Sequence, residues 1–555
     1  MATSPKHSYI RLLCLLCIIF LGILLFRLGF LMLFDRNPVK TYTDPNVAKQ
    51  VVRGTIYDRN QRILAIQTPY WGVYLHLNAV KDLQLVSEVI APFVQMNPEE
   101  IQNKAASYTT YAQIKERIDE RMVQPLLDAI QKYSLRGQVN VEKRVGRTYP
   151  AQFHASQIIG FTNTEGEGIE GIELSQESYL NPYPEIGDDP VTYGQDITLT
   201  LDLDIQYALD VQLQQIADEH KPDYAMAIVL DAANADILGM GSYPWYDINN
   251  LSSSKADQRK NHAVNHLFEP GSVFKLFSLA SVLKAGRNQA IEPFECDGSY
   301  TFKAGASTIT IKCTAVHGRV DPETMISKSC NGAIVHWARE TEPQAFYDTL
   351  SRLGFTSSYD IGLPSRARSQ IAPPSTWSGR SQATIAFGQE LLSSALHLAT
   401  AATALCPSGE LLQPNLILRR TSPVDGSILY ERQRVVLDTV LDSDTANLIR
   451  RGMLKATEEG GTGVRARVSG IDIGVKTGTA QILNPETNSY EDGTVLASTL
   501  AMVPIENPKY IIYIGAGNPK GDTIWGSNIA APAIASLVQT LASQGKLTPK
   551  DTAIR

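Results

Sequence analysis

The hydrophobic pattern is most extreme at the start of the chain. Residues 12–26 are an unbroken apolar run, and after Arg27 a second run covers residues 28–34. As one helix, residues 12–34 would be about 34 Å long, which is enough to cross the hydrocarbon core of a bilayer. The pattern therefore predicts a membrane-spanning segment, in which Arg27 is the one charged residue.

A cleaved signal peptide is the alternative, because the basic start with Lys6 and Arg11 suits either role. Cleavage needs a small-x-small site after the apolar core, and residues 27–31 offer none. We therefore favour an uncleaved anchor. Residues 1–11 contain two cations and no acid, whereas Asp35 follows the segment, which predicts a cytoplasmic N-terminus. About 520 residues would then lie outside the cytoplasm.

Shorter patterns follow in the next 180 residues. Alternating apolar residues predict strands, and a period near 3.6 predicts helices. The expected elements are a short strand running into a turn at 53–60, a strand at 70–75, mostly helix over 84–133, a strand at 197–201 and a helix at 205–217.

The pattern changes from about residue 222. Residues 225–230 and 237–240 predict paired core strands, and long helical stretches follow them. Further strands are expected near 472–480, 496–503 and 510–516. Strands at both ends of a helical interior predict one large α+β domain, whose sheet is completed from distant parts of the chain.

Composition excludes several classes of protein. The chain has 555 residues, of which 43% are hydrophobic and 19% charged, so it is neither disordered nor collagen-like. With 50 Lys and Arg against 57 Asp and Glu, the net charge of -7 offers no sign of a nucleic-acid-binding face. The mean hydropathy of -0.12 is too polar for a protein with many membrane spans.

Six cysteines are present, and Cys14 and Cys17 belong to the apolar segment. The other four are Cys296, Cys313, Cys330 and Cys406, and four cysteines allow three complete pairings. Cys296 and Cys313 are close in a polar, turn-rich segment and are the first candidates for a disulfide in an oxidising compartment. Two free thiols are the alternative, and the sequence leaves both open.

The motif Ser-x-x-Lys occurs at Ser252, Ser272, Ser281 and Ser543. Only Ser272 directly follows a forced turn, Glu269-Pro270-Gly271, at the start of an apolar helical stretch. There, unpaired backbone N–H groups favour a developing anion. Lys275 lies one turn further on, and its apolar neighbours would lower its pKa and permit a neutral amine base. An ordinary helix-capping serine with a surface lysine fits this segment alone equally well.

Two later segments decide between these readings. Ser329-Cys330-Asn331 heads a helical stretch, where its hydroxyl and amide could relay a proton and hold a substrate amide, although helix capping is the alternative role. Lys476-Thr477-Gly478-Thr479 follows an alternating strand, and the glycine would let a ligand approach the backbone. In order, these three motifs match the nucleophile, relay and carboxylate clamp of β-lactamases and penicillin-binding proteins.

With an anchor before these motifs, the chain resembles the class B penicillin-binding proteins, which are membrane-anchored peptidoglycan D,D-transpeptidases. Other landmarks that carry the resemblance are residues 53–60, 147–150, 168–173, 199–202, 269–272, 476–481 and 530–532. The resemblance implies a mixed α/β pedestal domain, and a transpeptidase domain with an antiparallel sheet flanked by helices, as in serine β-lactamases.

The resemblance also implies a role for each motif. Ser272 would attack the penultimate D-Ala of a stem pentapeptide and release the terminal D-Ala, with Lys275 as base. Ser329 and Asn331 would complete the relay. The carboxylate would be held by Lys476 and Thr477, in the strand that also contains Gly478 and Thr479. The oxyanion hole would be the N–H groups of Ser272 and Thr479, and no metal or cofactor is called for.

Three landmarks depart from the family pattern. A glycine of the Gly-Gln-Gly landmark is replaced in Gly388-Gln389-Glu390, and Val475 stands before Lys476 where the family often has glycine. The later Phe-x-Gly-Phe-x-Pro landmark corresponds to residues 498–504, which read Ser-Thr-Leu-Ala-Met-Val-Pro. These changes concern the wall of the cleft and the affinity for β-lactams.

We therefore expect a cytoplasmic N-terminus (1–11), a transmembrane anchor (12–34), a pedestal, dimerisation-like domain (35–195), a transpeptidase domain (196–545) and a tail (546–555). The protein would sit in the bacterial inner membrane, with its catalytic domain outside. Expected partners are stem pentapeptides, β-lactams as covalent inhibitors, a SEDS-family glycosyltransferase and division proteins, with no nucleic acid. A septal, FtsI-type role is favoured over elongation. The rival functions are a D,D-carboxypeptidase or β-lactam hydrolase and, outside enzymes, a β-lactam sensor or divisome scaffold.

Overall fold

The computed structural model describes residues 20–22, 50–183, 191–286, 291–484 and 489–550. Residues 20–22 are helical, and the rest of the expected membrane segment 12–34 lies outside the described residues. Among the residues that are described, no helix is both long and apolar enough to cross a membrane.

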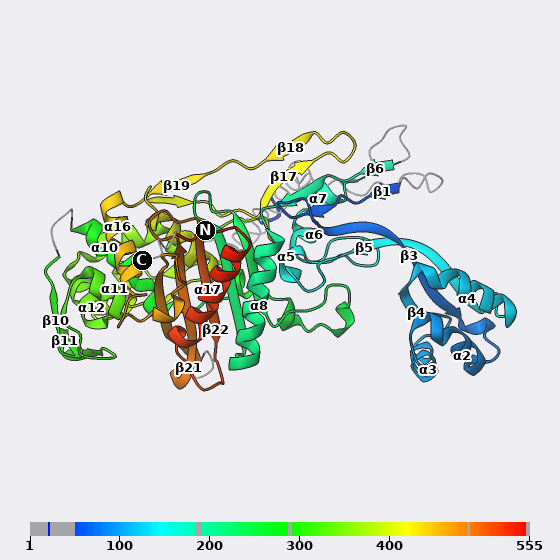
Figure 1. Ribbon diagram of the computed structural model, residues 1–555, viewed down its shortest axis with the longest axis horizontal. Coiled ribbons are helices and arrows are strands. Elements are labelled where there is room, and N and C mark those ends of the chain that lie inside the picture. The colour runs from blue at the N-terminus through cyan, green and yellow to red at the C-terminus, as the bar shows by residue number, and fades with distance from the viewer. Residues whose placement is uncertain (1–19, 23–49, 184–190, 287–290, 485–488, 551–555) are drawn as a thin grey trace, which may run out of the picture. The chain divides into compact units, whose positions relative to one another are not determined.

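A five-stranded sheet forms the centre of the larger domain (Figure 1). Its order is β20 (Gly474–Asn484), β21 (Ser489–Val503), β22 (Tyr510–Gly517), β8 (Tyr224–Asp231) and β9 (Ile237–Tyr243). All neighbouring strands are antiparallel. The pairing of β8 with β22 confirms that the sheet is completed from distant parts of the chain.

Helices cover both faces of this sheet (Figure 1). On one face α8 (Leu203–His220) packs with α17 (Gly526–Ser543) over a core of small and branched apolar residues. The prediction of a helix over 205–217 is thus confirmed, with both ends longer. The other helices of this domain are α9 (His262–Asn265), α10 (Lys275–Ala285), α11 (Pro322–Lys328), α12 (Asn331–Glu340), α13 (Pro343–Leu350), α14 (Ser381–Ala386), α15 (Ala395–Ala401) and α16 (Ser443–Lys455).

Short two-stranded pairs connect these helices. They are β10 (Phe294–Cys296) with β13 (Gly318–Val320), β11 (Ser299–Ala304) with β12 (Ser307–Lys312), β14 (Gln370–Ile371) with β15 (Leu391–Leu392), and β16 (Glu410–Leu412) with β19 (Val436–Thr439). The first two pairs lie beside the N-terminal end of α12, which matters for the site described below.

A second, seven-stranded sheet organises the N-terminal half. Its strands are β2 (Ile56–Tyr57), β3 (Ile63–His76), β4 (Tyr111–Ile118), β5 (Val139–Thr148), β7 (Asp196–Leu199), β17 (Ile417–Thr421) and β18 (Ile428–Glu431). Strands β17 and β18 come from much later in the sequence than the other strands, and β17 pairs with β7. The remaining elements are β1 (Gln50–Val52), α5 (Ser156–Ile159), α6 (Gly171–Ser175), α7 (Glu177–Leu180) and β6 (Val191–Tyr193).

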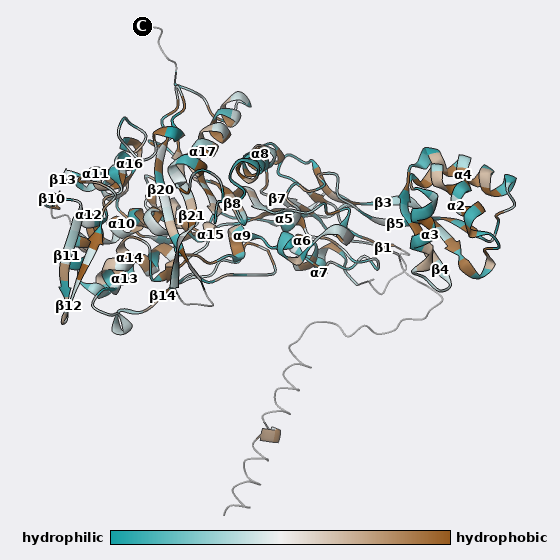
Figure 2. Ribbon diagram, turned by 90° about the horizontal axis from the view of Figure 1, so that it is seen from below, coloured by the Kyte–Doolittle hydropathy of each residue, from teal (hydrophilic) through white to brown (hydrophobic). Residues whose placement is uncertain are grey.

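Residues 84–133 are mostly helical, as predicted, but the unpredicted strand β4 divides the helices. Helices α2 (Leu83–Val94) and α3 (Pro98–Ala106) precede this strand, and α4 (Glu120–Lys132) follows it. Polar residues interleave with apolar ones in the helices and in β4 alike, so the sequence pattern did not separate the strand from the helices. The apolar side of each helix packs against β3–β5, and α4 has polar residues on its other side (Figure 2).

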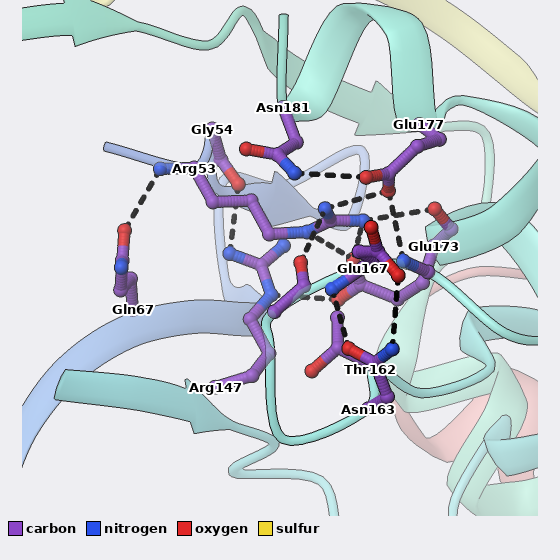
Figure 3. A network of polar contacts seen from close by, with 12 residues as sticks. Arg53, Gly54, Gln67, Arg147, Thr162, Asn163, Glu167, Glu173, Glu177 and Asn181 are labelled. Carbon is purple, nitrogen blue, oxygen red and sulfur yellow. Dashed lines mark hydrogen bonds and ion pairs between the residues drawn. The ribbon is translucent and has the colours of Figure 1, made fainter. Parts of the chain in front are cut away.

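Three pedestal landmarks of the sequence meet in one buried ion cluster (Figure 3). Glu173 is fully buried, and each of its carboxylate oxygens accepts a hydrogen bond from an arginine. The Nε of Arg53 lies 2.7 Å from one oxygen, and the Nε of Arg147 lies 2.6 Å from the other. Arg147 also donates to the carbonyl of Gly54 at 2.8 Å. The cluster therefore joins the entry to β2, the end of β5 and helix α6.

Candidate active site

Ser272 lies in a single 3₁₀ turn, η4 (Gly271–Phe274), which leads directly into α10. Glycines on two sides allow this turn to pack closely. Gly271 has a φ of +56°, and a Cβ there would lie 2.7 Å from the Cβ of Ala480. A Cβ on Gly478 would lie 2.9 Å from a methyl group of Val273. Strand β20 therefore packs directly against the turn that contains Ser272.

Lys275 is fully buried, and its amine faces the Ser329–Asn331 segment. Nζ donates to the carbonyl oxygen of Ser329 at 2.6 Å, to its hydroxyl at 3.1 Å and to Oδ1 of Asn331 at 2.5 Å. Burial lowers the pKa of Lys275 to about 8. The direction of this shift is the one that its apolar neighbours predicted.

Lys476 reaches the same hydroxyl from strand β20. Its Nζ donates to Oγ of Ser329 at 2.9 Å and to the carbonyl of Thr477 at 2.8 Å. Lys476 is also fully buried, and burial together with the nearby charge of Lys275 lowers its pKa well below the ordinary range. Ser329 holds the shared oxygen in place from a left-handed backbone conformation with a φ of +58°.

Asn331 begins α12, and both ends of its amide are engaged. Oδ1 accepts from Lys275, and Nδ2 donates to the carbonyl of Lys312 at 2.8 Å. The structure thus brings together the three segments that the sequence singled out. A substrate amide would meet an asparagine whose orientation is already fixed.

Thr477, Gly478 and Thr479 lie in β20, which is an edge strand of the five-stranded sheet. Thr477 is buried, whereas Thr479 is half-buried. The hydroxyl of Thr479 accepts the backbone N–H of Gly526 at 3.2 Å, so the start of α17 holds it in place. An edge strand of this kind can pair with an extended peptide.

The landmark at residues 388–390 packs against the turn that contains Ser272. The N–H of Gly271 donates to the carbonyl of Gly388 at 2.9 Å. Gly388 has a φ of +90°, and a Cβ there would lie 2.0 Å from the carbonyl oxygen of Gly271. Glu390 keeps a left-handed φ of +55°, and its N–H donates to Glu269 at 2.8 Å. The backbone therefore keeps a conformation suited to glycine although the side chain differs.

Sequence analysis did not single out Glu269 and Tyr490 as a pair. The Tyr490 hydroxyl lies 3.0 and 2.9 Å from the two carboxylate oxygens of Glu269. Burial raises the pKa of Glu269, and the bond from Tyr490 opposes this shift. The two residues are 221 positions apart, so no local pattern could have joined them.

The Val475 departure also has a structural explanation. Val475 is fully buried, and a Cβ on Gly463 would lie 2.1 Å from one of its methyl groups. Gly463 therefore provides the space that the larger side chain occupies. Residues 498–503 of the third departure lie in β21, where 498–502 pair with both β20 and β22 and Val503 pairs with β22.

Ser281 and Ser543, which begin two other Ser-x-x-Lys motifs, have structural roles. The Ser281 hydroxyl is buried and donates to the carbonyl of Phe277 at 3.0 Å. Ser543 is exposed and donates to the carbonyl of Thr540 at 2.7 Å. Their contacts are those of ordinary helix serines, as expected for the copies without a suitable context.

Cys296 and Cys313 are free thiols, as are Cys330 and Cys406. The Sγ atoms of Cys296 and Cys313 are 3.7 Å apart, which is far beyond the S–S bond length of about 2.05 Å. Sequence analysis missed that Cys330 and His317 join these two thiols. The available signal was Cys330 itself, which lies between two candidate catalytic residues.

Two family models match the chain. The penicillin binding protein transpeptidase domain matches residues 225–539, and the penicillin-binding protein dimerisation domain matches residues 48–186.

Relatives and solved structures extend over most of the chain. The probable peptidoglycan D,D-transpeptidase PenA of Neisseria meningitidis is 28% identical over 524 residues, covering 90% of this chain and 84% of that protein. The probable peptidoglycan D,D-transpeptidase FtsI of Caulobacter vibrioides is 28% identical over 506 residues, covering 88% and 81%. Penicillin binding protein 3 of Mycobacterium tuberculosis, complexed with ampicillin, aligns with a TM-score of 0.72 at 23% identity, over 91% of this chain and 98% of that one.

Proposed function

The chain belongs to the penicillin-binding protein transpeptidase family, and on this basis we propose the roles of its individual residues. The protein is a serine-type D-Ala-D-Ala transpeptidase of peptidoglycan synthesis, like the relatives whose names state that activity. The observation that carries the proposed roles is the convergence of Lys275 and Lys476 on one hydroxyl oxygen beside the Ser272 turn.

Ser272 is the nucleophile of the acylation step. Its oxygen forms a bond to the penultimate D-Ala carbonyl, and the amide bond to the terminal D-Ala breaks. The neutral amine of Lys275 takes the hydroxyl proton, and the Ser329 hydroxyl passes a proton to the leaving amine. The backbone N–H groups of Ser272 and Thr479 hold the developing oxyanion, at a value of about 3 kcal/mol for each donor.

The second step transfers the acyl group to an amine of another stem peptide. The amine nitrogen forms an amide bond, the ester bond to Ser272 breaks, and the serine recovers its proton. Asn331 holds the donor peptide, and the edge of β20 pairs with it. In the first step Lys476 and Thr477 hold the terminal carboxylate, which leaves with the released D-Ala, and Lys476 also bonds the Ser329 hydroxyl.

We further propose the organisation that the hydrophobic pattern favours. Residues 12–34 anchor the protein in the bacterial inner membrane, with residues 1–11 in the cytoplasm. The pedestal (35–195) and the transpeptidase domain (196–545) lie outside it. Membrane fractionation and protease protection test this arrangement: release of the full chain by alkaline carbonate would contradict an anchor.

We place the protein in septal synthesis, together with a SEDS-family glycosyltransferase and division proteins. The support is the resemblance to septal-type chains, including a relative named FtsI. Depletion in the host bacterium distinguishes the two roles. Filaments with blocked septa are the expected result, and rounded cells would assign the protein to elongation.

Transpeptidation and hydrolysis share the acyl-enzyme, so product analysis must separate them. The full-length chain in detergent is given a pentapeptide-bearing glycan and an amine acceptor. We expect release of D-Ala together with a cross-linked product that mass spectrometry identifies. Release of D-Ala without cross-links would identify the protein as a carboxypeptidase. If neither D-Ala nor a cross-linked product forms from an active glycan, the result would favour a sensor or scaffold.

A further inference from the structure

Three thiols and one imidazole meet directly beside the Ser329–Asn331 motif. The residues are Cys296, Cys313, His317 and Cys330, and their donor atoms all lie within 4.8 Å of one another. They come from four separate places: the end of β10, the residue after β12, the residue before β13 and the residue before α12. Cys296 and Cys330 are buried, while Cys313 and His317 are half-buried.

Three of the six donor–donor distances in this cluster match those of a tetrahedral zinc site. Zn–S bonds of about 2.3 Å at tetrahedral angles place two sulfurs about 3.8 Å apart. The observed Sγ–Sγ distances are 3.7 Å for Cys296 and Cys313, and 3.8 Å for Cys313 and Cys330. A sulfur and a ring nitrogen on the same ion would lie about 3.6 Å apart. The Cys296 Sγ and His317 Nδ1 are separated by 3.5 Å.

We propose that Cys296, Cys313, His317 and Cys330 bind one zinc ion. Three thiolates and one imidazole are the ligand set of closed, structural zinc sites. Each thiol loses its proton to solvent as its Zn–S bond forms, and His317 binds as neutral imidazole through Nδ1. No electron transfer is involved, and the four donors fill the coordination sphere.

Backbone donors surround the sulfurs in a way that suits thiolates. The N–H of Gly332 donates to Sγ of Cys313 at 3.2 Å, and the N–H of Ala333 donates to Sγ of Cys330 at 3.5 Å. Hydrogen bonds of this kind orient metal ligands and stabilise their charge. Both come from the first turn of α12, where free N–H groups favour negative charge.

A disulfide explains the cluster less well. Cys313 lies at nearly the same distance from Cys296 as from Cys330, so it has no preferred partner. Either bond would require the sulfurs to close by more than 1.5 Å, and it would leave one thiol and His317 unused. A zinc ion uses all four donors, and three of the six donor–donor distances already have the values that it needs.

The site would hold the catalytic motif in position. Cys330 is flanked by Ser329 and Asn331, which both bond Lys275. Asn331 also bonds the carbonyl of Lys312, the neighbour of Cys313. Fixing both sulfurs therefore fixes the backbone on either side of the relay. The four ligands are thus positioning residues, and this part of the inference depends on the proposed function.

Metal content tests the site independently of activity. The full-length chain, purified in detergent without chelators and exposed to zinc, should contain about one zinc per chain by elemental mass spectrometry. With cobalt in its place, it should show an intense thiolate-to-metal absorption band. Cys313→Ser and His317→Ala should lose the zinc, whereas the matched control Cys406→Ser should retain it, because Cys406 lies outside the cluster. Ser272→Ala should also retain it, which separates this test from the proposed function.

Two results would overturn the site. One is wild-type protein with less than one zinc per ten chains after exposure. The other is a Cys296–Cys313 or Cys313–Cys330 disulfide in non-reducing peptide maps of wild-type protein. Both results are measured on wild-type protein, so they do not depend on whether a variant folds.

The positioning role has its own readout. Removing zinc from wild-type protein should slow penicillin acylation about tenfold or more, and adding zinc should restore the rate. The loss should fall on the acylation rate constant more than on the apparent affinity. Zinc removal that leaves acylation unchanged would overturn the positioning role.

Discussion

The Nζ of Lys476 lies 2.9 Å from the hydroxyl oxygen of Ser329, although 147 residues separate the two in the chain. Lys275 contacts the same oxygen at 3.1 Å. Both amines are buried, and the nearby charge of Lys275 adds to burial in lowering the pKa of Lys476. Ser329 is therefore the residue through which the two lysines are coupled.

Removing this oxygen should impair acylation without unfolding the protein. For Ser329→Ala we expect the second-order rate constant for penicillin acylation to fall by about 100-fold or more, because the proton relay is broken. Stopped-flow or labelling kinetics measure this loss. Ser278→Ala is the matched control, since the buried Ser278 hydroxyl on α10 has no hydrogen-bond partner among the described residues. Equal rates for both variants would rule out the relay.

The pH dependence of acylation should follow Lys275. Its pKa is about 8 because of burial, and the reactive form is the neutral amine. Acylation should therefore rise about tenfold per pH unit below pH 8 and level off above it. Rates at several pH values with a β-lactam that is stable over that range give the profile. A flat profile between pH 6 and pH 9 would exclude Lys275 as the base.

Gly388 should be intolerant of a side chain. Its φ of +90° and the carbonyl of Gly271 at 2.0 Å from a built Cβ mean that Gly388→Ala must displace the Ser272 turn. We expect acylation to fall at least tenfold (about 1.4 kcal/mol in the barrier), because such sites depend on close positioning. Gly426→Ala is the control, with a φ of +73° but open space around it. A Gly388→Ala protein with wild-type kinetics would contradict this packing.

The buried ion cluster should contribute to the stability of the fold and not to the acylation reaction. Glu173→Ala leaves Arg53 and Arg147 uncompensated, and we expect a loss of about 3 to 5 kcal/mol in the free energy of unfolding. Denaturant titration of the full-length chain measures it. Glu177→Ala removes a more exposed partner of Arg53 and should cost less. The account of the cluster fails if the two variants are equally stable.

The three motif segments could be singled out from the sequence because each motif has chemistry of its own. Local pattern predicted a helix start at Ser272 and Lys275 and a strand near residues 472–480, and the structure has α10 and β20 there. The central sheet was also predictable, since its strands are strongly apolar. Periodicity did not predict β4, because charged residues obscure the alternation of this strand, which lies between two helices. It also did not predict that β17 and β18 join the seven-stranded sheet.

Long-range contacts account for the rest. The pairing of Glu269 with Tyr490 and the meeting of Arg53, Arg147 and Glu173 depend on the folded backbone. The cysteines show the same limit. Chain distance favoured Cys296 and Cys313 as a pair, whereas the fold adds Cys330 and His317 at comparable distances.

The central claim is that Ser272 forms the acyl-enzyme, and intact-protein mass spectrometry after exposure to a penicillin tests it most directly. Wild-type protein should gain the mass of one penicillin, with the adduct on a peptide containing Ser272. Ser272→Ala should gain none, while Ser281→Ala, in the other Ser-x-x-Lys on the same helix, should be labelled like wild type. Full labelling of Ser272→Ala, or an adduct on another serine, would contradict the account.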